Sequence, residues 1–599
     1  MSKFCSLFSF LTLHVHVVTT KPLVTLPETQ VTYRGTSVDS VEHFQNIRFA
    51  YDTSGPRRFA PPAPFAPVTG TEVDASTPGA ACPQTRDAMP PFFAETKEMS
   101  EDCLNLRIAR PQGTTSKSRL PVVVWLHGGG VVKGSAYDPH FEPDNLIRLS
   151  KDIDNPVLYV ALNYRLTVFG FAQMPILKQQ QSLNVGMRDQ RAGFQWVKDN
   201  IEAFGGDSGK ITVFGLSAGG TFASLHLMAY GGERGVPFNQ VWAMSGPPGT
   251  ALNMSSEVSE THTAAVAKSV RCDLKEEAEV LECLREVPMN ELLDAAMTYS
   301  VANFPPAGLF TFIPSVDDDY LPRSPISVVQ GRALRQGKFA PALNNQDLST
   351  IFSNYAMADF EHRVVEYEAR KEDKDLKVAV HYFRLAQILR DLLFTCSSID
   401  FGYEMSKQSR DSDFKPAGVR LYALNQSMLT PLWNGIGMSY IGVAHGSDTN
   451  YLFDLFPEGD VSKSDKALSR TLMGAFVRFA STGDPNGPKD DERMESWPES
   501  FTFDGKRTKL PVPQSLHVQI IGGPLGTSAS YQTVDSSEPR ENSEQEVFVR
   551  ADGTQQILQG YKIGTMPTTC VHLRSELLAR EKLLAQCAIL NSLADKLGV

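Results

Sequence analysis

Short, uninterrupted runs of apolar residues mark the predicted strands in the first half of the chain. Each run is rich in β-branched residues and is bounded by proline or glycine: residues 121–130 (PVVVWLHGGG), 156–165 (PVLYVALNYR) and 210–220 (KITVFGLSAGG). Runs of this kind are typical of strands that are covered on both faces, as in a parallel sheet. The sequence therefore predicts a large, mostly parallel central sheet.

Helical patterns separate these strands. Residues 188–207 place Phe194, Val197, Ile201 and Phe204 at helical spacing and end in Gly-Gly, a signal for the end of a helix. A second helix is predicted over 218–230, followed by a strand over 240–246. Strands and helices that alternate with short loops form right-handed crossovers, so the predicted class is α/β with helices flanking the sheet.

The rest of the chain has a different pattern. Residues 250–410 are mostly helical and charged, and we expect them to form cap-like insertions over the active-site end of the sheet. Residues 525–545 are polar and poor in aliphatic side chains, which predicts an exposed loop. The last 35 residues carry the pattern of a long amphipathic helix.

The ends of the chain and its charge indicate where the protein works. Residues 1–20 resemble a secretory signal peptide, although the alternation in HVHVV also fits a buried strand. No later run approaches the roughly 18 apolar residues of a membrane span, so no stable membrane anchor is expected. Sequons at Asn253 and Asn425 fit a secreted glycoprotein. A net charge of −11 argues against binding nucleic acid or anionic membranes through a broad basic surface.

Ser217 lies in the sequence GLSAGG, between the predicted strand 210–216 and the predicted helix from Ala218. A strand, a sharp turn and a helix are the setting in which a nucleophilic serine is held, and glycines at 215 and 219 permit the turn. The helix N-terminus directs free N–H groups toward an oxyanion. The alternative is that the segment is only a structural turn of small residues. The predicted strand and helix on either side favour the nucleophile over this alternative.

The sequence HGGG, His127 to Gly130, follows another predicted strand. Consecutive glycines leave backbone N–H groups exposed, and such donors stabilise the charge of a tetrahedral intermediate by about 3 kcal/mol each. The expected oxyanion hole consists of the N–H groups of Gly129, Gly130 and Ala218. His127 is interpreted as structural rather than as a catalytic base.

Several motifs in this order resemble the type-B carboxylesterase family, which holds carboxylesterases, cholinesterases and large fungal lipases. They are EDCLNLRI, VVWLHGGG, NYR, NVGMRDQRAGFQWVKDNIEAFGGD and VFGLSAGG. The resemblance implies an α/β-hydrolase fold over residues 21–599 as a single domain. It also implies a catalytic triad of serine, acid and histidine in that chain order.

The remaining triad members follow from the resemblance. GVAHGSDTNYLF resembles the family's histidine loop and indicates His445 as the base. ALNNQDLSTIF matches the position of the acid and indicates Asp347, although Asp stands for the commoner Glu and Leu348 for the usual Gly. Competing acids are Asp317, Asp318 and Asp319, interpreted as a polar turn, and Asp448, interpreted as a loop residue.

The chain has eight cysteines, none in the C-x-x-C spacing of a zinc site. The resemblance implies the disulfides Cys82–Cys103 and Cys272–Cys283, and a third between Cys396 and Cys587. Distant pairings do not follow from sequence, so Cys570 remains an alternative partner. Neither a metal nor an organic cofactor is implied.

Departures from the family narrow the expected substrate. The 82–103 loop has no tryptophan, and Leu216 precedes the nucleophile where cholinesterases have Glu, so choline esters are not expected. Residues that could line an apolar pocket, or simply pack in the core, are Leu216, Phe92, Phe93, Phe304, Phe310, Phe312 and Trp433. The expected function is a serine hydrolase of apolar, uncharged small-molecule or lipid esters. Alternatives are a lipase with a lid at 82–103 and a non-catalytic binding homologue; the oligomeric state is left open.

Overall fold

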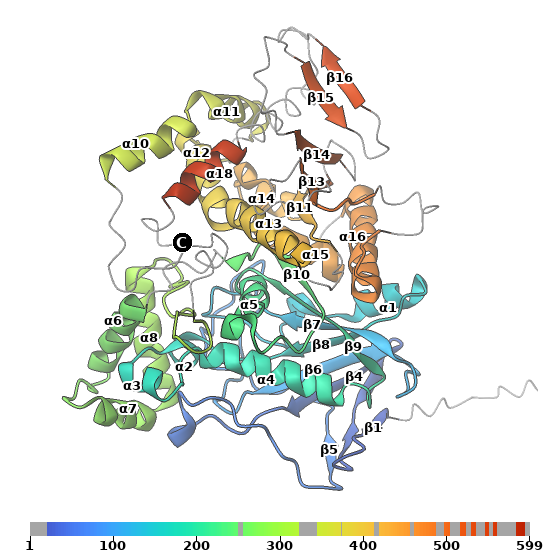
Figure 1. Ribbon diagram of the computed structural model, residues 1–599, viewed down its shortest axis with the longest axis vertical. Helices are drawn as coiled ribbons and strands as arrows, with labels where there is room; N and C mark the ends of the chain where they lie inside the picture. The colour runs from blue at the N-terminus through green and yellow to red at the C-terminus, as the bar shows by residue number, and fades with distance from the viewer. Residues whose placement is uncertain are drawn as a thin grey trace, which may run out of the picture.

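The computed structural model shows helices flanking a central sheet (Figure 1). It describes residues 21–248, 256–322, 344–372, 374–411, 418–455, 461–486, 496–502, 515–522, 529–534, 545–549, 555–559 and 583–593. The predicted signal peptide, the sequon at Asn253 and Cys570 lie outside these ranges. Within them, no helix is long and apolar enough to cross a membrane.

The central sheet has the strand order β10-β9-β7-β8-β6-β4-β3. Its strands are β3 (Thr36–Val38), β4 (Val41–Arg48), β6 (Asn105–Pro111), β7 (Leu120–Leu126), β8 (Leu158–Leu162), β9 (Gly206–Leu216) and β10 (Gln240–Met244). Strands β10, β9, β7 and β8 are parallel neighbours, whereas the pairs β8–β6, β6–β4 and β4–β3 are antiparallel. The predicted sheet is confirmed, and it is mixed.

The apolar pattern of the sequence did not predict the antiparallel strands of the central sheet, because these strands contain buried charges. Strand β6 is buried along its whole length although it contains two arginines. Arg107 pairs with Glu142, and Arg110 pairs with Glu42 on β4. Charged side chains can be buried when they are paired. This strand therefore lies in the core although its sequence is not an uninterrupted apolar run.

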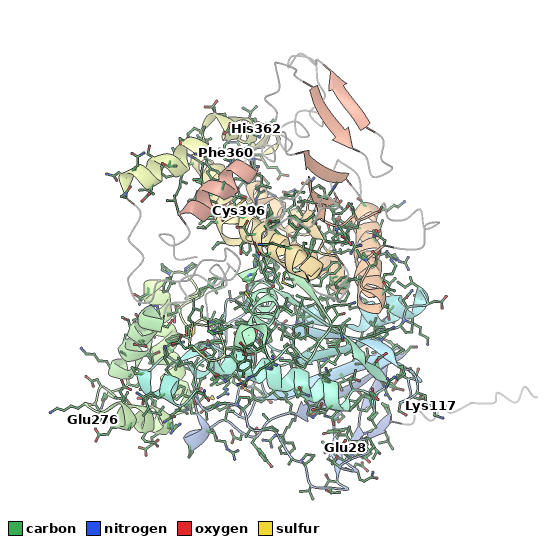
Figure 2. The ribbon with its side chains drawn as sticks, in the orientation of Figure 1. Glu28, Lys117, Glu276, Phe360, His362 and Cys396 are labelled. Atoms are coloured by element: carbon green, nitrogen blue, oxygen red, sulfur yellow. A yellow bond between two sulfur atoms is a disulfide. The ribbon has the colours of Figure 1, made fainter. Side chains whose placement is uncertain are left out.

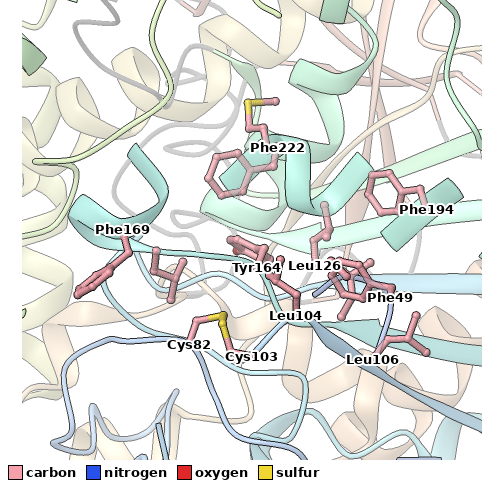
Figure 3. Close-up of a cluster of buried hydrophobic side chains, with 14 of the residues drawn as sticks. Phe49, Cys82, Cys103, Leu104, Leu106, Leu126, Tyr164, Phe169, Phe194 and Phe222 are labelled. Carbon is pink, nitrogen blue, oxygen red and sulfur yellow. A yellow bond between two sulfur atoms is a disulfide. The ribbon is translucent and has the colours of Figure 1, made fainter. Parts of the chain in front are cut away.

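Both faces of the sheet are covered. Alternate side chains of β7 enter two different cores: Val122, Val124 and Leu126 enter one, and Val123 and Trp125 enter the other. Figure 3 shows the first core, where Leu126 lies near Tyr164, Phe194 and Phe222. This alternation is the two-residue period of a strand buried on both sides, as the apolar runs predicted.

The helices of the first half are α1 (Asp144–Asp152), α2 (Thr167–Phe171), α3 (Pro175–Gln179), α4 (Val185–Asn200) and α5 (Ala218–His226). The predicted helix 188–207 corresponds to α4 and ends earlier, at Asn200. Ile201 and Phe204 are nevertheless buried, in the turns between α4 and β9. Apolar spacing therefore marked the buried face correctly but not the helix end.

The described part of residues 250–410 is mostly helical, as the sequence predicted. It contains α6 (Ser256–Ser269), α7 (Glu277–Glu286), α8 (Met289–Asn303), α10 (Asn345–Asn354), α11 (Ala358–Arg370), α12 (Val380–Arg390), a π-helical turn (Asp391–Thr395) and α13 (Cys396–Asp411). Figure 1 shows α6 to α8 beside the sheet and α10 to α13 in a second group. That these helices are insertions into one domain stays a prediction.

The last part of the chain adds α14 (Thr430–Gly435), α15 (Ser447–Phe453), α16 (Lys463–Thr482) and α18 (Leu583–Ser592). Smaller sheets are built from β1 (Leu23–Thr25), β2 (Thr32–Arg34) and β5 (Glu72–Asp74); from β11 (Leu421–Leu424), β12 (Phe501–Thr502), β13 (Ser515–Ile521) and β14 (Ala529–Val534); and from β15 (Gln545–Val549) and β16 (Gln555–Gln559). α18 falls within the amphipathic helix predicted for the C-terminus.

The prediction of an exposed loop over residues 525–545 was wrong for β14. Residues Ala529–Val534 form a strand that pairs antiparallel with β13. The segment ASYQTV alternates apolar and polar residues, but its polar composition masked that signal. Pairing with the edge of β13 is a non-local interaction that composition does not reveal.

Among the described residues there are three disulfides, and each is a predicted one: Cys82–Cys103, Cys272–Cys283 and Cys396–Cys587. The third joins the first residue of α13 to α18, and Figure 2 shows Cys396 beside this helix. Asn425, a predicted glycan site, has its side-chain nitrogen buried. The residue as a whole is half-buried, and its glycosylation stays a prediction.

Candidate active site

Ser217 occupies a sharp turn between β9, which ends at Leu216, and α5, which begins at Ala218. Its backbone has φ 55° and ψ −123°, a strained conformation for a residue with a side chain. The Ser217 N–H donates to the Met244 carbonyl at 2.9 Å, and the Thr221 N–H donates to the Ser217 carbonyl at 2.9 Å. The predicted strand–turn–helix setting is thus present, and its hydrogen bonds hold the strained turn.

The glycines around Ser217 are required by close backbone approach. A Cβ atom on Gly219 would collide with the Leu126 carbonyl oxygen at the end of β7. A Cβ atom on Gly215 would lie 2.5 Å from the Gly219 carbonyl carbon. Only glycine lets α5 pass this close to β7 and β9.

The glycines after β7 face the same turn. A Cβ atom on Gly128 would lie 2.5 Å from the Leu216 carbonyl oxygen and 3.2 Å from the Ser217 Cβ atom. Gly129 and Gly130 have φ values of 104° and 58°. The Gly129 carbonyl accepts from the Lys133 N–H at 3.2 Å, and the Gly130 carbonyl accepts from the Phe310 N–H at 3.1 Å. Both carbonyls are therefore fixed by neighbouring residues.

His127 is a structural residue, as interpreted from the sequence. Its ring is buried and stacks on Tyr164 with a centroid distance of 4.3 Å. Burial lowers the pKa of His127 to about 4, so its imidazole is neutral near neutral pH. The Tyr164 hydroxyl donates to the His127 carbonyl at 2.5 Å, which fixes the start of the glycine loop.

His445 lies in the loop before α15, and this loop contacts the strand that leads to Ser217. A Cβ atom on the next residue, Gly446, would lie 3.1 Å from Phe92 Cε1 and 3.5 Å from Leu216 Cδ2. The His445 ring faces a cavity of about 1690 Å³ and stacks on Phe394 at 4.9 Å. The ring is accessible from the cavity, whereas protein packs around its other sides. This desolvation lowers the pKa of His445 to about 4.

Asp347 is the third residue of α10 and is buried. Its Oδ2 atom accepts from the Asn344 N–H at 3.0 Å, while its own N–H donates to Asn344 Oδ1 at 2.9 Å. This reciprocal capping box fixes the carboxylate at the N-terminus of the helix. Its pairing with His445 stays a prediction.

The competing acids differ in their surroundings. Asp317 accepts from Asn184 at 2.8 Å and Asp319 accepts from Arg188 at 2.7 Å, and both bonds are structural. Asp448, interpreted from the sequence as a loop residue, is instead buried in the first turn of α15. The Tyr422 hydroxyl donates to Asp448 Oδ2 at 2.7 Å, and burial raises the pKa of Asp448.

The predicted pocket residues divide into two groups. Leu216 and Phe92 meet at Gly446 in the histidine loop, and the Phe310 N–H donates to the Gly130 carbonyl in the glycine loop. Phe93 belongs to the core instead, where it packs edge-on against Phe141 at 5.7 Å. Phe312 is buried in the other core, Phe304 is exposed, and Trp433 is buried without lining the cavity.

Two further side chains were missed because no motif marks them. Phe394, in the π-helical turn between α12 and α13, stacks on His445. A Cβ atom on Gly130 would lie 2.6 Å from the Leu309 Cδ2 atom, so the Leu309 side chain fills that space. Phe394 and Leu309 are far in the sequence from the residues that they contact. Only the folded structure therefore shows that they lie beside His445 and Gly130.

Comparison with known proteins agrees with this geometry. Residues 20–357 and 339–511 match the model of the carboxylesterase family. The chain belongs to the carboxylesterase family. It is 32% identical to an inactive carboxylesterase-like protein of Byssochlamys spectabilis, over 84% of this chain and 90% of that protein. It is 33% identical to a secreted lipase of Arthroderma benhamiae, over 86% of this chain and 91% of the lipase.

The fold is that of the α/β-hydrolases. A solved thermophilic pNB esterase superposes with a TM-score of 0.61 and 23% identity, over 86% of this chain and 98% of the esterase. Acetylcholinesterase of Bungarus fasciatus is 28% identical over 82% of this chain and 81% of the enzyme. Membership of the carboxylesterase family supports hydrolysis of carboxylic esters.

In this carboxylesterase-family chain, the 82–103 loop is fastened to the segment that follows the glycine loop 127–130. Gln84 exchanges two hydrogen bonds with the backbone of Gly134, at 2.7 and 2.8 Å. The Lys133 ammonium donates to the Thr85 carbonyl at 3.1 Å and to Thr96 Oγ1 at 3.0 Å. A lid movement of this loop would have to break these bonds.

One cluster among the described residues brings metal-ligating atoms together, namely His43, Glu142 and Asp144. The Arg107 guanidinium already donates to Glu142 Oε1 at 2.5 Å. The His43 Nε2 atom lies 3.3 Å from Asp144 Oδ1. Because a fixed cation occupies this cluster, we interpret it as an ion-pair network that ties β4 and β6 to α1.

Proposed function

We propose that this protein is a serine carboxylic ester hydrolase that works through an acyl-enzyme. The observation that carries the proposal is the strained turn at Ser217, which lies against the glycine loop at Gly128, while the side chain of the preceding Leu216 meets the His445 loop at Gly446. Family membership alone does not establish activity, because one relative is named inactive. The presence of Ser217, His445 and the glycines favours an enzyme over a binding homologue.

In the proposed mechanism, the Ser217 oxygen attacks the ester carbonyl carbon while His445 accepts the hydroxyl proton. Asp347 orients the imidazole and stabilises the imidazolium. The N–H groups of Gly129, Gly130 and Ala218 bind the oxyanion. The intermediate collapses, His445 protonates the departing alcohol, and Ser217 keeps the acyl group. His445 then takes a proton from water as the water oxygen attacks the acyl carbon. The bond between the acyl carbon and the Ser217 oxygen breaks, His445 returns the proton to that oxygen, and the acid leaves.

The proposed substrates are apolar, uncharged esters. Leu216 and Phe92 lie at the histidine loop, and no carboxylate replaces Leu216 there to attract a cationic alcohol. Phe383 and Phe394 line the cavity that His445 faces. Two relatives are named secreted lipases, which supports lipid esters as candidates and an extracellular location.

Hydrolysis of p-nitrophenyl esters from acetate to palmitate tests the proposal. We expect turnover by the purified chain, and the preferred acyl length distinguishes an esterase from a lipase. A folded protein, verified by circular dichroism and a cooperative melt, that hydrolyses no member of the series would contradict the proposed function.

The acid limb of the pH profile is expected near pH 4. Only neutral imidazole accepts the serine proton, and burial lowers the pKa of His445 to about 4. Activity should therefore rise through pH 4 and remain level toward neutral pH, when kcat/KM is measured with an uncharged ester. The His140→Gln variant is the control, because His140 pairs with Asp138 at 2.9 Å away from the candidate base. A limb centred near 6.5 would contradict a pKa set by burial alone and would indicate that a carboxylate beside His445 offsets the effect of burial.

Two amide substitutions separate the candidate acids. We expect Asp347→Asn to lower kcat by about 10³-fold or more, because an amide neither selects the right tautomer nor stabilises imidazolium. Asp448→Asn should cost much less, because an amide oxygen still accepts the Tyr422 hydroxyl. Steady-state kinetics of both variants check this. The opposite ranking would move the role of the acid to Asp448.

A further inference from the structure

A π-helical turn, Asp391–Thr395, joins α12 to α13 and carries Phe394. Turns of this kind are rare and occur frequently at functional sites. Phe394 is half-buried and lines the cavity that His445 faces. Its ring stacks on the His445 ring, with the ring centres 4.9 Å apart and the ring planes at 28°. The turn therefore places an aromatic ring against the candidate base.

The first residue of the turn, Asp391, is fixed by buried hydrogen bonds. Its side chain is inaccessible to solvent. The Tyr355 hydroxyl, at the end of α10, donates to Asp391 Oδ2 at 3.1 Å, and Gln387 Nε2 donates to the same oxygen at 2.8 Å. The Arg390 guanidinium donates to Asp391 Oδ1 at 3.1 Å. Moving this carboxylate would leave a buried charge unpaired, so the start of the turn has little freedom.

The residue that follows the turn, Cys396, is fixed by a covalent bond. It begins α13 and forms the disulfide with Cys587 of α18. A second contact ties the same two helices together, because the Asn591 side chain of α18 donates to Asp400 Oδ2 of α13 at 2.5 Å. Phe394 lies two residues before Cys396, so the ring is carried by a segment that is held at both ends.

The imidazole of His445 needs a partner that sets the plane of its ring. The outer side-chain torsion of a histidine is broad, so packing rather than torsional preference decides this plane. Within the described ranges of the chain, the stack on Phe394 is the interaction found for the His445 side chain. The proposed hydrogen bond to Asp347 would direct one ring nitrogen but would still let the ring turn about that bond. The stack blocks this rotation.

We propose that Phe394 is a positioning residue, and that the turn fixed at Asp391 and Cys396 uses its ring to hold the His445 imidazole in the orientation that proton transfer from Ser217 needs. The proposal rests on the ester hydrolase function and deepens it. Phe394 acts through His445 rather than on the ester. His445 is the proposed base in both acylation and deacylation, so loss of the ring slows both steps alike and leaves KM unchanged.

Kinetics of Phe394→Leu and Phe394→Tyr in the full chain test this role. We expect Phe394→Leu to lower kcat for p-nitrophenyl acetate by about tenfold with KM unchanged, because small displacements of a catalytic group are costly. Phe394→Tyr keeps the ring and should retain the wild-type kcat. The matched control is Phe65→Leu, since Phe65 is also half-buried and packs on an aromatic ring, that of Tyr51 at 5.2 Å, outside the cavity lining. A loss that appears in KM, or only with long acyl chains, would overturn the proposal, because the ring would then merely line a pocket.

Tyr355→Phe tests whether the fixed turn acts through Phe394. It removes one donor to Asp391 and keeps the Tyr355 ring. We expect kcat to fall by about threefold in the wild-type background and not to fall further in Phe394→Leu, because residues that act through one contact are not additive. Additive losses would overturn the role of the turn.

A measurement without ester turnover separates this proposal from the proposed function. Diethyl pyrocarbonate acylates neutral imidazole, and mass spectrometry of the peptide that contains His445 gives the rate. Phe394→Leu should raise this rate by about threefold, the factor by which an aromatic pair favours the stacked ring, whereas Phe394→Tyr should not. An unchanged rate in Phe394→Leu would overturn the proposal. A wild type that hydrolyses no ester, but whose labelling depends on Phe394, would instead reject the hydrolase function.

Discussion

Ser217→Ala is expected to lower kcat/KM for p-nitrophenyl esters by at least about 10⁴-fold. Alanine removes the oxygen that forms the acyl-enzyme, and no second hydroxyl replaces it at the turn. The backbone hydrogen bonds to Met244 and from Thr221 do not involve the side chain, so the fold should persist. The residual rate would come from the oxyanion donors acting on water.

The control for this variant is Ser208→Ala. Ser208 is half-buried, and its hydroxyl donates to the exposed Glu202, so its loss should leave kinetics unchanged. A second variant, Ser217→Gly, should be equally inactive but more stable than Ser217→Ala by about 1 kcal/mol, because glycine adopts the observed φ without strain. An active Ser217→Ala protein would remove Ser217 from the mechanism.

Gly219→Ala is expected to destabilise the protein by about 3 kcal/mol and to abolish ester turnover. The new methyl group would meet the Leu126 carbonyl oxygen and come within 2.8 Å of the His127 carbonyl oxygen. Both partners are backbone atoms, so neither can rotate away. Relief requires β7 and α5 to separate, which displaces Ser217 from the glycine loop.

Gly209→Ala, on strand β9 that leads to Ser217, provides the matched control. Its Cβ atom would lie 3.2 Å from the Asp207 carboxylate oxygen, a flexible and partly exposed group, and Gly209 has no positive φ. Denaturant unfolding of both variants, followed by the p-nitrophenyl assay, measures the difference. Equal stability of Gly219→Ala and wild type would show that the close approach at β7 is not required.

The sequence pattern predicted some strands of the fold and missed others. The strands β7, β8 and β9 carried short apolar runs because their apolar stretches are buried on both faces, and they were predicted together with β10. Strands β4 and β6 were not, because buried arginines paired with glutamates break the apolar pattern. Strand β14 was taken for a loop because its partner, β13, supplies the pairing that its composition lacks.

The sequence by itself determined the turn at Ser217 and the glycine loop, because each depends on local backbone demands. The disulfides followed only from the resemblance to the family, because the spacing of Cys396 and Cys587 does not fix their pairing. A serine between a strand and a helix, with glycines where no Cβ fits, leaves few conformations open. Only the tertiary structure decided that Phe93 lies in the core, that Phe394 stacks on His445 and that Asp448 is buried. These outcomes depend on which distant elements pack together, and packing is a property of the whole chain that no local pattern encodes.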